Sequence, residues 1–72
     1  MTTPIINARN QFKGTISAIN RGQVVSEVEV TTLSGLVTSV ITTRSIDELQ
    51  LTIGSEVLAF VKATEVAVAK LA

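Results

Sequence analysis

The side chains best suited to chemistry in this chain are hydrogen-bond donors that gather at three places in the sequence. These donors are Arg9 and Asn10, then Thr42, Thr43 and Ser45, and finally Lys62 and Thr64. Guanidinium, ammonium and hydroxyl groups, together with backbone N–H groups, are the donors that a tetrahedral oxyanion needs. Spacing alone also fits a helix cap, a solvated strand end and a surface cation, so an anion site is one of two interpretations.

A short helix is predicted beside the middle group of donors. Ser45 is followed three residues later by Glu48, which is the pattern of a capping box, so the helix is expected to begin at Ser45 and to turn over Ile46 and Leu49. The N-terminal amides of a helix carry partial positive charge. An anion near Thr42 would therefore be favoured, although most helix N-termini bind none.

The chain lacks the residue types that most often support catalysis and direct metal coordination. It has no His and no Cys, so the usual general base, the thiolate nucleophile, the disulfide and the common zinc ligands are all missing. The six carboxylates are scattered, without the spacing of a calcium loop. Glu27 and Glu29 alternate with valines, which is typical of the solvated face of a strand. We expect no enzyme, no cofactor and no metal held by side chains.

Length and composition favour an oligomer. A chain of 72 residues forms one domain and buries only about 60% of its unfolded surface, so small domains often need disulfides, metals or partner subunits. Its residues are 46% hydrophobic but only 3% aromatic, which is more aliphatic surface than one small core readily hides. Surplus apolar surface usually marks a subunit interface. A tightly packed aliphatic monomer is the alternative.

Charge and hydropathy narrow the choice of partners. Six basic residues balance six acidic ones, so nothing attracts a polyanion such as DNA, whereas a small anion needs only a few local donors. Single-strand binding also needs exposed aromatic platforms, and Phe12 and Phe60 both lie in strand patterns typical of a core. There is no signal-peptide pattern and no apolar run approaching 18 residues. We expect a cytoplasmic protein without a nucleic-acid or membrane partner.

The hydrophobic pattern predicts an all-β fold. Alternation typical of strands occurs over residues 12–19, 23–31, 36–42, 56–62 and 66–70, with turn residues between them. Five short strands and one helical turn indicate a small five-stranded OB-like barrel. We expect an N-terminal tail at residues 1–5 and a single domain over residues 6–70.

Four motifs follow one another in order along most of the chain. Residues 7–15 are similar to S-A-R-N-Q-L-x-G-x, residues 20–22 to x-[KR]-G, and residues 41–49 to I-T-x-x-S-x-x-x-L. Residues 54–57 and 61–66 match G-x-x-V and [IV]-K-A-[ST]-x-V. Each motif is weak alone, but together they resemble the molybdate-binding Mop domains, or molbindins, and the related TOBE domains.

The resemblance implies an OB-type barrel that forms a homohexamer, as a trimer of dimers, and binds molybdate or tungstate at subunit interfaces. The matched positions that would donate to the anion are Arg9, Thr42, Ser45 and Lys62, with Ala63 and Thr64 adding a backbone N–H or a hydroxyl. Thr42 and Ser45 would come from one subunit, and Arg9 and Lys62 from another.

The resemblance has two further implications, one for a turn of three residues and one for Asn7. A second anion site on the threefold axis would use the turn Asn20, Arg21 and Gly22. Asn7 stands where the family usually has a Ser that donates to the anion, so either its longer amide or its backbone N–H would take that place.

The resemblance thus implies intracellular binding and storage of molybdate or tungstate, as part of molybdenum homeostasis. No DNA-binding or ATPase segment accompanies the domain, which favours a store over a regulator or transporter. The alternative is an assembly or regulatory interaction module with a vestigial anion site, and the change at Asn7 is its one hint. A nucleic-acid-binding OB domain is the third choice.

Overall fold

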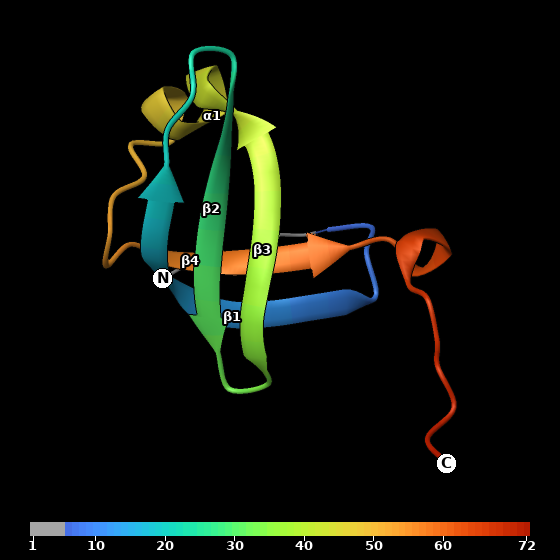
Figure 1. Cartoon of the computed structure of the whole chain (residues 1–72). Coiled ribbons are helices and arrows are strands. Elements are labelled where there is room, and N and C mark those ends of the chain that lie inside the picture. Colours follow the sequence, from blue (N-terminus) through green and yellow to red (C-terminus); the bar gives the residue numbers. More distant parts are fainter. Residues whose placement is uncertain (1–5) are drawn as a thin grey trace.

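The chain folds as a curled antiparallel sheet with one short helix (Figure 1). The computed structural model describes residues 6–72, and the tail predicted at residues 1–5 lies outside them. Over the described residues the four-stranded sheet has the order β3-β2-β1-β4. Its elements are β1 (Asn10–Asn20), β2 (Val25–Thr32), β3 (Gly35–Thr42), the helix α1 (Thr43–Glu48), β4 (Glu56–Val61) and the 3₁₀ turn η1 (Ala63–Glu65).

Strand β1 joins the two halves of the sheet. Its first half pairs with β4, from Asn10 opposite Val61 to Thr15 opposite Glu56, and its second half pairs with β2. The β1–β2 register shifts between Ile16 and Ala18, and such a bulge bends a strand and increases its twist. As a result the first half of β1 and the strand β4 run across the direction of β2 and β3 (Figure 1).

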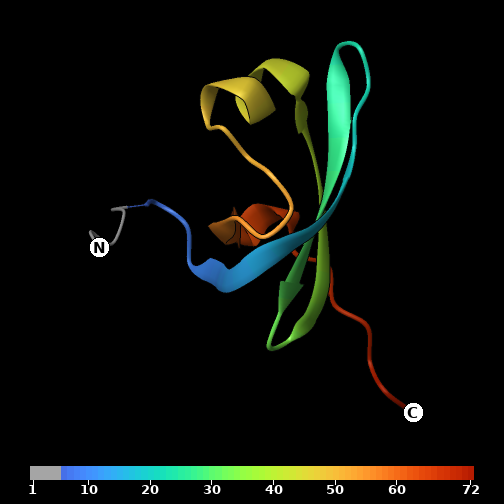
Figure 2. The same ribbon diagram turned by 90° about the vertical axis from the view of Figure 1, so that its left-hand side faces the viewer.

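The core lies between the sheet and α1, which stands against one face of the sheet (Figure 2). Ile46 of α1 packs with Ile16, Val28 and Val30, and all four are almost fully buried. The alternation in β2 turns Val28 and Val30 inward and leaves Glu27 exposed, as the pattern predicted. Partly buried aliphatic residues surround this cluster: Ile19, Val37, Ile41, Leu51 and Val57.

The helix begins earlier than predicted, so the capping box at Ser45 is wrong. Thr42 is the N-cap: its backbone is extended, and its Oγ1 accepts the Ser45 N–H at 3.1 Å. Ser45 is therefore the third helical residue rather than the cap. The reason is that Thr42 ends β3, and its hydroxyl satisfies one of the amides that the first turn leaves unpaired.

The strand predicted at residues 66–70 is absent from the described part of the chain, so the barrel does not have five strands there. After η1 the chain runs away from the sheet (Figure 1), and Val68 and Leu71 are almost fully exposed. Alternation marks a segment that can form a strand, but a strand also needs a hydrogen-bonding edge to pair with. The all-β class with one short helical turn is confirmed.

Many aliphatic side chains and one phenylalanine remain exposed on this single chain. The prediction that Phe60 lies in the core is wrong here, because the residue is 55% exposed. Val24, which directly precedes β2, is 74% exposed. The other exposed large apolar residues are Val25, Leu33, Leu36, Val40, Leu49, Ile53, Val66, Val68 and Leu71. No helix among residues 6–72 is long and apolar enough to cross a membrane.

Replacing Gly14 tests the close approach of β1 and β2. A Cβ at Gly14 would collide with the carbonyl oxygen of Thr31 and lie 2.7 Å from Cγ1 of Val30. We expect Gly14→Ala to lower the free energy of unfolding by about 2 kcal/mol, within the range for overpacking. Chemical denaturation measures this, with Lys13→Ala on the exposed face of β1 as the control. Equal stability of the two variants would contradict the close approach of β1 and β2.

Candidate functional site

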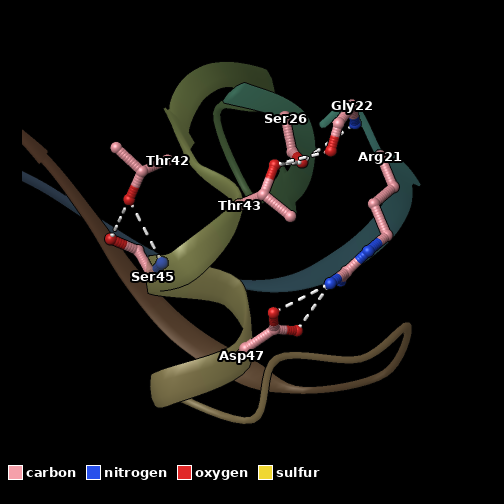
Figure 3. A network of polar contacts seen from close by, with 7 residues as sticks. All are labelled: Arg21, Gly22, Ser26, Thr42, Thr43, Ser45 and Asp47. Atoms are coloured by element: carbon pink, nitrogen blue, oxygen red, sulfur yellow. Dashed lines mark hydrogen bonds and ion pairs between the residues drawn. The ribbon is translucent and has the colours of Figure 1, made fainter. Parts of the chain in front are cut away.

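The predicted donors Thr42 and Ser45 lie where β3 passes into α1 (Figure 3). The Thr42 Oγ1 and Ser45 Oγ atoms are 2.8 Å apart, and Thr42 Oγ1 also accepts the Ser45 N–H. One hydroxyl proton is used between the two oxygens, whichever residue donates. The pair therefore offers one O–H to an external acceptor, and that O–H is strengthened because its oxygen already accepts a hydrogen bond.

The backbone amides at the start of α1 are less available than the sequence suggested. The Thr43 N–H donates to the Val24 carbonyl oxygen at 2.9 Å, and the Ser45 N–H donates to Thr42 Oγ1. The helix has only six residues. The hydroxyl pair is thus the clearer outward donor at this end of the molecule.

A cation missed in the sequence lies beside Thr42. Arg44 lines the same open hollow of about 350 Å³ as Thr42, Gln23 and Val24. Its position inside the I-T-x-x-S motif was the available signal, but a single exposed arginine carries little information on its own. Arg44 therefore adds a positively charged side chain to the lining of this hollow.

Next to the hydroxyl pair, in the interior, lies a buried polar cluster that the sequence analysis did not predict. Thr43 Oγ1 donates to the Gly22 carbonyl oxygen at 2.8 Å and lies 2.7 Å from Ser26 Oγ, which accepts the Gly22 N–H at 3.2 Å (Figure 3). Ser26 and Thr43 are 2% and 7% exposed. The signal was a serine in the inward phase of β2, in line with Val28 and Val30.

The predicted second site is formed by the connection between β1 and β2. Asn20, Arg21 and Gly22 together line an open hollow of about 280 Å³, so the structure brings them to one place. Arg21 is already paired, however: its Nη2 lies 2.8 and 2.9 Å from the two carboxylate oxygens of Asp47. Glu27 lines the same hollow, which lowers its attraction for an anion.

The remaining predicted donors lie at the end of the β1–β4 pair where β1 begins and β4 ends. Asn10 opposite Val61 is the last pair there, so Arg9 and Lys62, which flank it, leave the sheet at the same end. Lys62 also precedes η1, which contains Ala63 and Thr64. Asn7, Arg9, Lys62, Ala63 and Thr64 are all exposed.

The two groups of donors do not meet within one chain. Thr42 ends β3 and Lys62 follows β4, and these strands are opposite edges of the sheet. Figure 1 shows α1 at the upper left of the molecule and η1 at its right, well apart from each other. Among the described residues there is also no cluster of His, Cys, Asp or Glu that could hold a metal ion. A ligand here would be bound by hydrogen bonds and charge.

Comparison with known proteins agrees with the motifs. Residues 6–68 match the family model of the TOBE domain. The chain is 42% identical over 62 residues to molybdenum-pterin-binding protein 3 of Clostridium pasteurianum, covering 85% of this chain and 91% of that protein.

Two solved structures have the same fold, which confirms the predicted OB-like class. A molybdate-binding protein from Sporomusa ovata has a TM-score of 0.87 and 33% identity, covering 93% of this chain and all of that one. The cytoplasmic molybdate-binding protein ModG, with molybdate bound, has a TM-score of 0.76 and 47% identity, covering 81% of this chain and 42% of ModG. The chain therefore belongs to the molbindin family of Mop and TOBE domains.

Proposed function

We propose that this protein binds molybdate or tungstate and stores it, at sites shared between subunits of a homo-oligomer. The observation that carries the proposal is the separation of the donors into two exposed groups at opposite ends of one chain. Similarity to a molybdenum-pterin-binding protein, and to two molybdate-binding proteins, supports the choice of ligand.

In the proposed site, one subunit supplies Thr42 and Ser45, and another supplies Arg9 and Lys62. Ala63, Thr64 and Asn7 of the second subunit add N–H, O–H or amide donors. The two cations compensate the charge of a dianion, while the hydroxyl and N–H groups fix its orientation. Each charge-assisted hydrogen bond contributes about 1.5–3 kcal/mol, so several of them make specific binding feasible without any metal–ligand bond from the protein.

The assembly we propose is a hexamer built as a trimer of dimers. Its support is the apolar surface on the single chain: Leu36 and Val40 on the edge strand β3, and Val66, Val68 and Leu71 beyond η1. Burying such surface between copies is favourable. A ligand held only by the assembled protein would in turn stabilise the assembly by mass action.

The same proposal includes the remaining expectations. The protein acts by binding rather than catalysis, and in the cytoplasm, since the similar ModG is described as a cytoplasmic protein. A second anion position at Asn20, Arg21 and Gly22 would lie on the threefold axis, where a bound anion would compete with Asp47 for Arg21.

Titration of the apo protein with molybdate, tungstate and sulfate tests the ligand. We expect molybdate and tungstate to release heat and to raise the melting temperature more than the smaller sulfate does, because the similar proteins are molybdate-binding proteins. Light scattering after size exclusion should give the mass of a hexamer. A monomer unaffected by molybdate would overturn the storage function and favour the interaction-module alternative.

Removing either cation tests the contribution of the second subunit. We expect Arg9→Ala and Lys62→Ala to raise the Kd for molybdate at least about tenfold, which corresponds to 1.4 kcal/mol. Both side chains are exposed, so the melting temperature of the apo protein should hardly change. Calorimetry measures the Kd, and Lys13→Ala, an exposed cation on β1, is the matched control. Wild-type affinity in either variant would show that the site is misplaced.

The hydroxyl pair tests the contribution of the first subunit. Ser45→Ala removes one oxygen but frees the Thr42 proton, so we expect molybdate binding to weaken by less than about tenfold. Thr42→Val with Ser45→Ala removes the one outward O–H that the pair offers and should weaken binding by about ten- to a hundredfold, since a charge-assisted hydrogen bond contributes about 1.5–3 kcal/mol. Thr42→Ser keeps both hydroxyls and serves as the control. If the double variant bound no worse than Ser45→Ala, the pair would not contact the anion.

A further inference from the structure

The buried cluster behind the hydroxyl pair is a closed ring of hydrogen bonds with one direction. The single Thr43 hydroxyl proton is given to the Gly22 carbonyl oxygen, so in the 2.7 Å contact with Ser26 it is Ser26 that donates. Ser26 Oγ in turn accepts the Gly22 N–H. Gly22 thus provides both the first donor and the last acceptor, and each hydroxyl both donates and accepts.

This ring connects three segments of the chain. Gly22 belongs to the β1–β2 connection, Ser26 to β2, and Thr43 is the first residue of α1. The Thr43 N–H adds a backbone tie to the Val24 carbonyl oxygen. On the outer side, the ion pair between Arg21 and Asp47 joins the same connection to α1 (Figure 3).

The ring holds the first residue of α1, directly beside the outward donors Thr42 and Ser45. Thr43 is buried while its neighbour Thr42 is exposed, and the Thr42 hydroxyl fixes Ser45 at 2.8 Å. Any rotation of α1 relative to β2 would move Thr43 out of the ring and would shift Ser45 relative to Thr42, which is held in β3 opposite Val25. A pair of apolar side chains could fill the same space but would leave this rotation less restricted, because hydrogen bonds are directional and apolar contacts are not.

We propose that Thr43 and Ser26 are positioning residues for the anion site, and that their ring with Gly22 sets the selectivity for molybdate over sulfate. This inference rests on the proposed function. The two anions carry the same charge and differ in size, so donors held at fixed distances can distinguish them. A loosened pair would adjust to the smaller anion and lose that discrimination.

The test compares Thr43→Val, which keeps the shape and removes the hydroxyl, with Thr43→Ser, which keeps the hydroxyl. The Kd values for molybdate and sulfate are measured by calorimetry well below the melting temperature of each variant. For Thr43→Val we expect a molybdate Kd about tenfold higher and a molybdate-to-sulfate preference reduced by about the same factor. Thr43→Ser should recover most of both.

A matched control separates positioning from stability. Val30→Ala truncates a buried core residue of β2 outside the ring, so it should lower the melting temperature and leave both Kd values unchanged. Ser26→Ala keeps the hydrogen bond from Thr43 to Gly22, and it serves as the test if Thr43→Val does not fold. We expect it to reduce the preference for molybdate as well.

Three results would count against these assignments in different ways. If the wild-type protein binds molybdate and Thr43→Val binds both anions with wild-type affinities, the positioning role is overturned and the proposed function stands. The positioning role is also overturned if Val30→Ala changes the preference as much as Thr43→Val does. If the wild-type protein itself binds no molybdate, the proposed function and this inference fail together.

Discussion

The pairing of one strand with two different partners determines the rest of this structure. The first half of β1 pairs with β4 and the second half with β2, and the close approach at Gly14 and the register shift after Ile16 allow the strand to bend between them. The bend places the Asn10 end of β1 beside the end of β4 and the Asn20 end beside α1. It therefore fixes where both groups of donors lie.

In the proposed function, recognition of the anion depends on assembly of the subunits. A dianion needs several converging donors and compensating cations, since burying a charge without partners is costly. One chain presents cations at Arg9 and Lys62 and a hydroxyl pair at Thr42 and Ser45, on opposite edges of its sheet. The same chain leaves much aliphatic surface exposed. Contact between copies of the chain would bury the exposed apolar surface. It would also bring the two groups of donors together around one anion.

Much of the fold could be predicted because strand alternation is a local property. Side chains on a strand alternate between faces, so the pattern in β2 correctly placed Val28 and Val30 inside and Glu27 outside. The helix start was wrong by several residues, since the cap depends on which hydroxyl meets a free amide, and Thr42 did so before Ser45. The strand predicted at residues 66–70 was wrong for a related reason: the pattern does not supply a partner edge.

By itself, the sequence determined the chemistry available and the family. Without His or Cys, but with Arg9, Thr42, Ser45 and Lys62 inside family motifs, it favoured an oxyanion bound by donors rather than a metal centre. The resemblance already implied that these donors come from two subunits, and the tertiary structure shows them separated within one chain. Only the tertiary structure showed that a ring through Ser26 and Thr43 lies next to one of the two groups. The reason is that residue types and local patterns fix what each side chain can do, whereas long-range strand pairing fixes which side chains meet.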